Sequence, residues 1–290
     1  MLPLLAVAAV PLALHAVWRI RYGYPPQTLP RVLCFHKISR RFCLEGTWTT
    51  PQRFAAMIDR LLERGWTFID EATFLHSLEA PDPANARRAF LTFDDGYAHL
   101  ADTAFSVLAE RGIPFHVFLV TDYTGRDNTW DLGLGRPRFR HLDDGVIREM
   151  ASAGVSFGSH SAAHADLTRL PDAALRDDLA RSRDEVARLA GRPARTLSYP
   201  FGIYNDAVRR AAAEAGYAAA FSLYPAHRNR IVDRHALRRD AVYIIDPVWG
   251  VETKLRPGPL YGLEEMKCRA INAVARLTPL LKSKRASQPG

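Results

Sequence analysis

Two short clusters of acidic and imidazole side chains carry the chemistry that this sequence can support. Asp94 and Asp95 follow the apolar run 89–93, and His160 and His164 come about one βαβ unit and a loop later. Two imidazoles and one carboxylate can hold a divalent metal and leave a coordination position for water, while the other carboxylate acts as a base. Zinc suits such ligands, and cobalt or nickel is tolerated. These two carboxylates and two imidazoles are the groups that a water-activating, metal-dependent hydrolase needs.

Each cluster alone also has a plain structural explanation. Asp-Asp-Gly at 94–96 is good turn chemistry in any protein. The four-residue offset between His160 and His164 also occurs in surface histidines near the start of a helix. The metal hypothesis is favoured by the position of the two clusters together, because each one directly follows a predicted strand.

Alternating strands and helices are expected to position these clusters. The pattern predicts strands at 31–36, 66–69, 89–93, 115–120, 155–158, 196–199, 219–222 and 242–244. It predicts helices at 51–65, 71–78, 101–111, 143–153, 172–190 and 205–215. Repeating βα units with short connections favour a mainly parallel sheet wrapped by helices, open or closed into a barrel. In such folds chemistry gathers at the carboxyl ends of the strands.

Composition describes an ordinary globular protein with a basic surface. The chain has 290 residues, 48% hydrophobic and 24% charged, with a net charge of +8 and a pI near 9.6. That charge favours anionic partners such as a membrane surface. We expect no nucleic acid, since no binding motif or aromatic platform accompanies the basic residues, and we expect a monomer. The three cysteines, Cys34, Cys43 and Cys268, argue against a disulfide framework, although the first two can pair in an oxidising compartment.

The two ends of the chain differ from its body. Residues 1–22 are expected to form a membrane anchor or an atypical signal, and 23–30 a Pro-rich linker to a catalytic domain at 31–250. Positive charges after the apolar run favour a cytoplasmic catalytic domain; a periplasmic or extracellular one is the alternative. The basic helical tail, 251–290, is expected either to lie on an anionic membrane or to pack on its own domain.

Three motifs in this order resemble those of the polysaccharide deacetylases, carbohydrate esterase family 4, whose domain is also called the NodB homology domain. They are Thr92-Phe93-Asp94-Asp95-Gly96, His160-Ser161-Ala162-Ala163-His164 and Tyr199-Pro200-Phe201-Gly202. The likeness spans about 32–243, and the motif style is closest to the branch that deacetylates poly-N-acetylglucosamine. The resemblance implies a distorted (β/α) barrel that removes an acetyl group from an N-acetylated amino sugar, in a polysaccharide or a lipid-linked glycan, with a slight preference for the lipid-linked substrate.

The resemblance also implies roles for single residues. Asp95, His160 and His164 would bind one divalent metal ion, and Asp94 would be the general base. The third motif would supply the backbone N–H for the oxyanion, which we assign to Tyr199, with Pro200, Phe201 and Gly202 beside the substrate. His36, after the first strand, is the candidate general acid, with a packed histidine as the alternative explanation and His235 as the fallback acid.

The sequence departs from the family pattern in two places. Ser198 stands where many relatives have an arginine that steadies the base, so Arg238 or Arg239 is expected to replace it. The late Leu-x-His motif is absent. These departures keep a second hypothesis open, a catalytically inactive deacetylase-like protein that binds glycan or acts as a scaffold at the membrane. Amide hydrolysis of a non-sugar substrate would use the same site, and specificity would depend on loops such as 121–140, where Trp130 either faces the sugar or anchors the loop.

Overall fold

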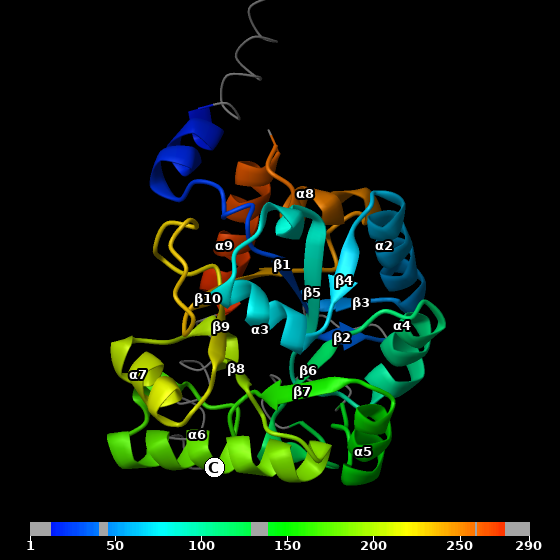
Figure 1. Cartoon of the computed structure of the whole chain (residues 1–290), viewed down its shortest axis with the longest axis vertical. Coiled ribbons are helices and arrows are strands. Elements are labelled where there is room, and N and C mark those ends of the chain that lie inside the picture. Colours follow the sequence, from blue (N-terminus) through cyan, green and yellow to red (C-terminus); the bar gives the residue numbers. More distant parts are fainter. Residues whose placement is uncertain (1–12, 41–45, 129–138, 259, 276–290) are drawn as a thin grey trace, which may run out of the picture.

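The chain folds into a closed parallel barrel surrounded by helices (Figure 1). This computed structural model describes residues 13–40, 46–128, 139–258 and 260–275. The strands of the main sheet are β1 (Arg31–Phe35), β4 (Thr67–Ile69), β5 (Arg88–Phe93), β6 (His116–Leu119), β7 (Ser156–Ser159), β8 (Thr196–Ser198), β9 (Ala219–Leu223) and β10 (Leu237–Ala241). The ring runs β1-β10-β9-β8-β7-β6-β5 and closes from β5 back to β1. The predicted (β/α) barrel is therefore confirmed.

Strand β5 closes the barrel by pairing with three neighbours. One edge pairs with β1 along its whole length, from Arg31 opposite Ala89 to Phe35 opposite Phe93. The other edge is shared, because β4 pairs with residues 88–90 and β6 pairs with residues 92–93. Since β1 and β5 end side by side, the residues that follow them meet at the same end of the barrel.

Amphipathic helices cover the barrel, and side-chain caps fix where several of them begin. They are α2 (Pro51–Glu63), α3 (Glu71–Glu79), α4 (Ser106–Glu110), α5 (Asp144–Ser152), α6 (Asp172–Ala190), α7 (Asp206–Glu214), α8 (Val251–Leu255) and α9 (Tyr261–Ala275). Thr50, Asp70, Asp143 and Asn205 each accept a hydrogen bond from an amide in the first helical turn that follows. A π-helical segment, η2 (Ala101–Phe105), leads into α4.

The remaining elements are short. The 3₁₀ turns are η1 (Pro83–Arg87), η3 (Thr121–Tyr123), η4 (Leu167–Arg169), η5 (Pro200–Gly202) and η6 (Val248–Gly250). Strands β2 (Lys37–Ile38) and β3 (Trp48–Thr49) form a small separate sheet. Because β2 starts immediately after His36, this small sheet belongs to the carboxyl end of β1.

A buried polar network sits among the aromatic side chains inside the barrel. His116 is fully buried, and its two ring nitrogens lie 2.8 Å from the Ser156 hydroxyl and 3.0 Å from the Thr196 hydroxyl. The Thr196 hydroxyl donates to Glu71 at 2.8 Å. Burial raises the pKa of Glu71 to about 7 and lowers the pKa of His116 to about 3. His116 is thus a core residue whose two ring nitrogens both have hydrogen-bond partners.

The last barrel strand lies earlier in the chain than predicted. The sequence predicted a strand at 242–244, but β10 is Leu237–Ala241, a segment that contains Arg238, Arg239 and Asp240. Arg239 and Asp240 are buried and Arg238 is half-buried, and each of the three is paired with an opposite charge inside the protein. A hydrophobicity pattern cannot identify a strand whose buried positions are ionic.

The described part of the C-terminal tail packs on the barrel. Tyr261, Cys268 and Lys254 are buried, and Lys254 pairs with Asp246 at 2.9 Å. Of the two alternatives for 251–290, packing on the domain is confirmed for α8 and α9; residues 276–290 lie outside the described part.

At the other end of the chain, residues 13–21 form a helix attached to α9. Its Trp18 is buried against Tyr24 and Tyr261, while Leu14, Val17 and Ile20 are exposed. Within the ranges that the structure describes, no helix combines the length and the apolar character needed to cross a bilayer.

Candidate active site

The carboxyl ends of three barrel strands bring the predicted acidic and imidazole residues together. His36 follows β1, Asp94 and Asp95 follow β5, and His160 follows β7. Backbone bonds continue the sheet past the strand ends, since Asp94 N–H donates to Phe35 O at 2.9 Å and His160 N–H donates to Leu119 O at 2.7 Å. The barrel register itself therefore sets the spacing of the site.

The turn after β5 places Asp95 by means of an unusual backbone. Asp95 has a φ of 69° and Gly96 a φ of 63°. Aspartate tolerates this left-handed region better than most residues. At Gly96 a Cβ would stand 2.7 Å from Cδ2 of Leu119, so the motif glycine is needed both for its conformation and for its closeness to β6.

The three predicted metal ligands form one tight triangle. Nε2 of His160 lies 3.6 Å from Oδ1 of Asp95, and Nε2 of His164 lies 3.4 Å from the same oxygen. One ligand atom from each residue lies within 4.8 Å of the other two. Ligands about 2.1 Å from a tetrahedral zinc ion lie about 3.4 Å from one another. The residues present therefore fit one zinc-sized divalent cation.

A second contact orients the His160 ring for this task. Its Nδ1 lies 2.7 Å from the carbonyl oxygen of Ser198, and because a carbonyl can only accept, Nδ1 carries the proton. The lone pair of Nε2 then points into the space shared with Asp95 and His164, the arrangement of a metal-binding histidine held by an outer partner. Burial lowers the pKa of His160, which keeps the ring in the neutral form that binds metals.

Asp94 is held by a buried arginine. Arg239, which is 0% exposed, donates to both carboxylate oxygens at 2.6 and 2.7 Å, and the Ser198 hydroxyl donates to Oδ2 at 3.3 Å. Burial on its own raises the pKa of Asp94, but the Arg239 guanidinium holds that pKa well below its usual range. Asp94 is therefore a carboxylate, and β10 supplies the cation that position 198 lacks.

Arg238, the other candidate for steadying the base, faces away from the site. It pairs with Asp240 at 2.5 Å and with Glu265 of α9 at 2.9 Å. Neighbouring side chains in a strand point to opposite sides, so Arg238 and Arg239 cannot serve the same carboxylate. The assignment of Arg238 as base-orienting is wrong, and that of Arg239 is supported by its bidentate contact.

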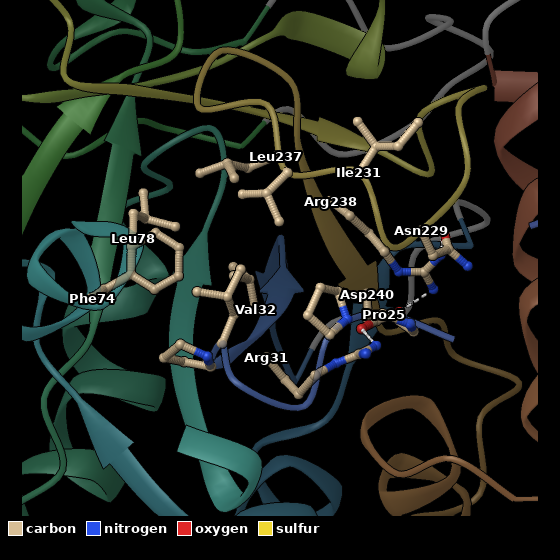
Figure 2. A pocket seen from close by; sticks show the side chains of 14 residues that line it. Pro25, Arg31, Val32, Phe74, Leu78, Asn229, Ile231, Leu237, Arg238 and Asp240 are labelled. Atoms are coloured by element: carbon tan, nitrogen blue, oxygen red, sulfur yellow. Dashed lines mark hydrogen bonds and ion pairs between the residues drawn. The ribbon is translucent and has the colours of Figure 1, made fainter. Parts of the chain in front are cut away.

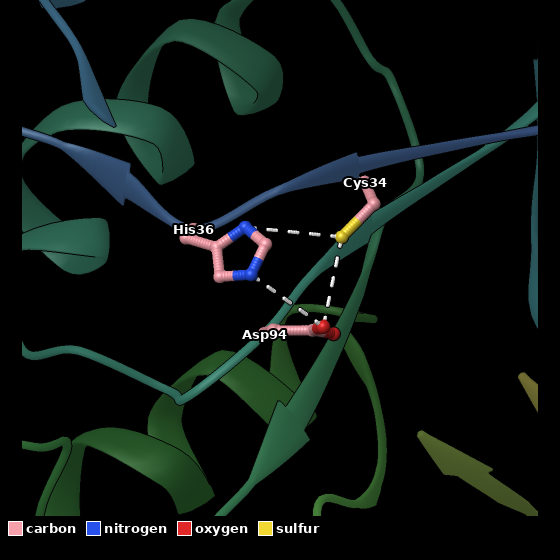
Figure 3. Close-up of side chains that lie close together, drawn as sticks. All are labelled: Cys34, His36 and Asp94. Atoms are coloured by element: carbon pink, nitrogen blue, oxygen red, sulfur yellow. Dashed lines mark hydrogen bonds and ion pairs between the residues drawn. The ribbon is translucent and has the colours of Figure 1, made fainter. Parts of the chain in front are cut away.

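His36 and Cys34 lie close to Asp94 (Figure 3). Its Nε2 is 3.9 Å from Oδ2 of Asp94, and its Nδ1 is 3.9 Å from Sγ of Cys34. Burial lowers the pKa of His36 to about 4, against the pull of Asp94. Burial also raises the pKa of Cys34 well above its usual value, so this residue stays a thiol. One ligand atom from each of Cys34, His36 and Asp94 lies within 4.8 Å of the other two, but both carboxylate oxygens of Asp94 are already held by Arg239.

The third motif contributes a different amide from the one predicted. Tyr199 N–H donates to Phe221 O at 2.9 Å as part of the barrel ladder, and Pro200 has no N–H. Gly202 N–H donates to Tyr199 O at 2.9 Å. Among the described residues the structure records no acceptor for the amide of Phe201. The Tyr199 amide is therefore not available for an oxyanion, and the amide of Phe201 is the one in this motif for which the described residues offer no acceptor.

The shape of the third motif explains why it contains glycine. Phe201 has a φ of 58° and places its ring 4.6 Å from that of His164. Gly202 has a φ of 64°, and a Cβ there would lie 2.8 Å from the backbone nitrogen of Leu223. The tight turn thus packs the Phe201 ring against a candidate metal ligand and brings the whole motif against β9.

Two other predicted residues do not reach the described site. Nε2 of His235 lies 2.9 Å from Tyr217 O, near the start of β10, so the fallback acid is away from the strand ends. Trp130 lies outside the described residues. The sequence analysis gave no role to the Ser198 hydroxyl, which accepts a hydrogen bond from Arg239 at 2.7 Å. The only sequence signal for such a role is that Ser198 directly precedes the third motif.

The amino end of the barrel also has a pocket, shown in Figure 2, but it is not a candidate site. Its volume is about 60 Å³, whereas ligand sites usually measure about 300–1,000 Å³. Its charged residues are already paired, since Asp240 accepts from Arg31 and from Arg238, each at 2.5 Å. The ionic groups there serve the fold.

The fold and site define a class of protein, a parallel (β/α) barrel whose catalytic face carries two carboxylates and two imidazoles from separate strand ends. Residues 82–220 match the family described as polysaccharide deacetylase, so the chain contains a polysaccharide deacetylase domain. His36 and Arg239 lie outside the matched residues, and their placement comes from the geometry of this chain.

Curated relatives match at low identity. The chain is 25% identical to YxkH of Bacillus subtilis (strain 168) over 214 residues, which cover 74% of this chain and 71% of that protein. It is 24% identical to the poly-beta-1,6-N-acetyl-D-glucosamine N-deacetylase of Staphylococcus aureus (strain MSSA476) over 148 residues. That match covers 47% of this chain and 48% of the relative, so the chain spans about half of it.

Solved structures agree with the fold. IcaB from Ammonifex degensii superposes with a TM-score of 0.67 at 24% identity, covering 78% of this chain and 97% of that one. The deacetylase PplD of Streptococcus pyogenes, in complex with acetate, gives a TM-score of 0.66 at 17% identity, covering 79% and 98%. At these identities the likeness establishes the barrel, and the chemistry rests on the site residues.

Proposed function

We propose that this protein is a metal-dependent hydrolase that removes the N-acetyl group from an amino sugar in a polysaccharide. The observation that carries the proposal is the triangle of Asp95, His160 and His164 beside the arginine-held Asp94. The family match and the poly-N-acetylglucosamine deacetylase among the relatives support the choice of substrate.

A divalent cation, zinc in our proposal, would lower the pKa of a bound water and polarise the amide carbonyl. Asp94 receives the proton released by the attacking water. Because Arg239 keeps the pKa of Asp94 low, the carboxyl does not retain this proton. His36, whose Nε2 is 3.9 Å from Asp94, passes it to the leaving nitrogen. The products are acetate and the free amine of the sugar.

The backbone contributes to the same step. The amide of Phe201 is free to donate to the oxygen that becomes negative when the carbonyl carbon is attacked. The left-handed conformation of Phe201 holds that amide in place before the substrate binds. The donor therefore does not have to be reorganised during the reaction.

The alternative, an inactive glycan-binding or scaffolding protein, is less well supported. Its two arguments were Ser198 in place of an arginine and the absence of the late Leu-x-His motif. Arg239 makes the missing contact from β10, and His36 lies 3.9 Å from Asp94. Burying the charge of Asp94 is unfavourable unless a second buried charge, here Arg239, neutralises it. A protein that only binds glycan does not need such a buried pair.

Acetate release from a poly-β-1,6-N-acetylglucosamine oligomer tests the proposal directly, with a lipid-linked amino sugar as the comparison substrate. We expect turnover of the oligomer, and a loss of about 10²–10⁴-fold in kcat for Asp94→Asn and for His36→Gln. His235→Gln is the matched control, since its ring bonds to Tyr217 O away from the site. Full activity in Asp94→Asn would refute the base assignment, and a wild-type protein that releases no acetate from either substrate would refute the proposed function.

We also propose that the protein contacts a membrane through its N-terminal region. The support is the net charge of +8 and the exposed Leu14, Val17 and Ile20 on the helix at 13–21. Co-sedimentation with vesicles containing anionic lipid should fall when Val17 and Ile20 are both changed to serine. The cytoplasmic side for the catalytic domain stays a prediction, which a topology reporter at the C-terminus would check.

A further inference from the structure

The connection between β6 and α5 ends in a segment, 139–142, that packs against the turn carrying Asp95. Leu142 N–H donates to Gly96 O at 2.8 Å on one side, and Leu142 O accepts from Gly125 N–H at 2.9 Å on the other. The Leu142 side chain is buried in a hydrophobic cluster of the core. The segment is therefore fixed on both edges, and the residue before Leu142 is held beside Asp95.

That residue, His141, contacts the backbone of a candidate metal ligand. Its Nδ1 lies 2.7 Å from the carbonyl oxygen of Asp95, and because a carbonyl can only accept, Nδ1 carries the proton and donates it. The His141 ring is 2% exposed and contacts the rings of Tyr97 and Tyr123, with centroids 5.0 and 5.7 Å away. Burial and these ring contacts limit rotation of the imidazole, so its donor stays directed at Asp95.

The Asp95 backbone depends on such a partner because its conformation is an uncommon one. Its φ of 69° lies in the left-handed region, which few residues other than glycine adopt. This conformation sets the direction of the carboxylate, whose Oδ1 lies 3.6 Å from Nε2 of His160 and 3.4 Å from Nε2 of His164. Without a donor on its carbonyl, the turn is free to relax and to carry the carboxylate away from the two imidazoles.

We propose that His141 is a positioning residue of the metal centre, which holds the Asp95 carbonyl and thereby keeps the Asp95 carboxylate in the triangle with His160 and His164. His141 acts through Asp95 and supplies no ligand of its own. The inference rests on the proposed function, which assigns the same triangle to a divalent cation. Loss of an outer partner of a metal ligand typically weakens metal binding about 10–100-fold, and this sets the size of the expected effect.

The test measures the zinc dissociation constant of chelator-treated protein in competition with a chromophoric chelator. His141→Phe keeps a ring without the donor and should weaken zinc binding about 10–100-fold. His141→Asn places an N–H at the position of Nδ1 and should restore most of that loss. His235→Phe is the matched control, because the His235 ring also bonds to a backbone carbonyl, that of Tyr217 at 2.9 Å, but near the start of β10; it should leave zinc binding unchanged.

Thermal unfolding separates a positioning role from a purely structural one. A structural role predicts that His141→Phe lowers Tm by the same amount with and without zinc. The positioning role predicts that zinc raises the Tm of this variant less than that of the wild type, because the rise depends on the dissociation constant. If His141→Phe does not fold, His141→Gln takes its place, since its amide is one bond further from the backbone than Nδ1 and should also weaken zinc binding.

Zinc binding by His141→Phe that equals that of the wild type would overturn the inference, and so would a His141→Asn variant that binds zinc as weakly as His141→Phe. Acetate release distinguishes this failure from that of the proposed function. If zinc binding depends on His141 but the wild-type protein releases no acetate from either glycan, the positioning role stands and the proposed deacetylation fails.

Discussion

Replacing Arg239 with methionine tests the most heavily buried interaction of the site. The substitution leaves the Asp94 carboxylate without its cation at a position where Arg239 is 0% exposed and Asp94 is 2% exposed. Removing one partner of a buried ion pair costs about 3–5 kcal/mol, because the other charge remains uncompensated. For a domain of this size each kcal/mol lowers Tm by about 2–4 °C, so the expected loss is roughly 6–20 °C.

The pH dependence of this loss gives a second readout. In the wild type the pKa of Asp94 is depressed, so its contribution to stability is present above about pH 4 and is lost as pH falls through the folded pKa. In Arg239→Met the burial that raises the pKa is no longer opposed. The stability of the variant is then greatest below about pH 4 and is lost as pH rises through the raised pKa. The difference in Tm between the two proteins should therefore be smaller at pH 4 than at pH 8.

Thermal unfolding of chelator-treated protein measures both effects. Arg176→Met is the matched control, since that arginine is 64% exposed and pairs with a Glu214 that is 51% exposed; it should cost at most about 1 kcal/mol. The neutral double variant Asp94→Asn/Arg239→Met should recover part of the stability while remaining inactive. If Arg239→Met costs no more than Arg176→Met at pH 8, the buried pair does not have the role assigned to it.

Three further outcomes are expected. The pKa of Glu71 is raised from 4.5 to about 7, so its ionisation should lower the free energy of unfolding by about 3 kcal/mol as pH rises from about 4.5 through 7. Glu71→Gln should remove this pH dependence of the unfolding free energy, measured in urea. An unchanged pH dependence would contradict the assignment. Gly202→Ala should lower the free energy of unfolding by more than about 2 kcal/mol, because its Cβ would lie 2.8 Å from the backbone nitrogen of Leu223. Gly191→Ala has a similar φ of 67° but open space around the Cβ, so it should cost about 1 kcal/mol. Equal losses of stability in the two variants would mean that the close approach at Gly202 is unimportant. An ester in place of the Phe201 amide should lower kcat about 10²–10³-fold with little change in KM, and an unaffected kcat would place the oxyanion donor elsewhere.

The parallel strands and the meeting of the two clusters could be predicted because their signals are local, whereas the closure into a barrel and the choice of Asp95 as the metal ligand came from the resemblance to the deacetylases. Apolar runs followed by Asp94 or by His160 mark strand ends, and parallel strands bring their carboxyl ends together. The capping residues Thr50 and Asn205 mark helix starts in the same local way. No tertiary information was needed for these elements.

The parts that the sequence did not determine depend on contacts distant in the chain. β10 was misplaced because its buried positions are ionic, and the partner of Arg239 lies 145 residues away. The assignment to Tyr199 failed because its amide is used by Phe221 of β9, which only the barrel register reveals. The hydrogen bond between His141 and Asp95 joins residues 46 positions apart, so no local pattern could indicate it.

Two neighbouring residues offer the most direct test of the central claim, that one carboxylate binds a cation while the adjacent one acts as a base. The measurement is the divalent metal content per chain of wild-type protein, Asp94→Asn and Asp95→Asn after dialysis against zinc. We expect about one ion per chain in the wild type and in Asp94→Asn, and a large loss of bound zinc in Asp95→Asn. Equal metal content in the two variants, or a wild type that binds no zinc, would contradict the account.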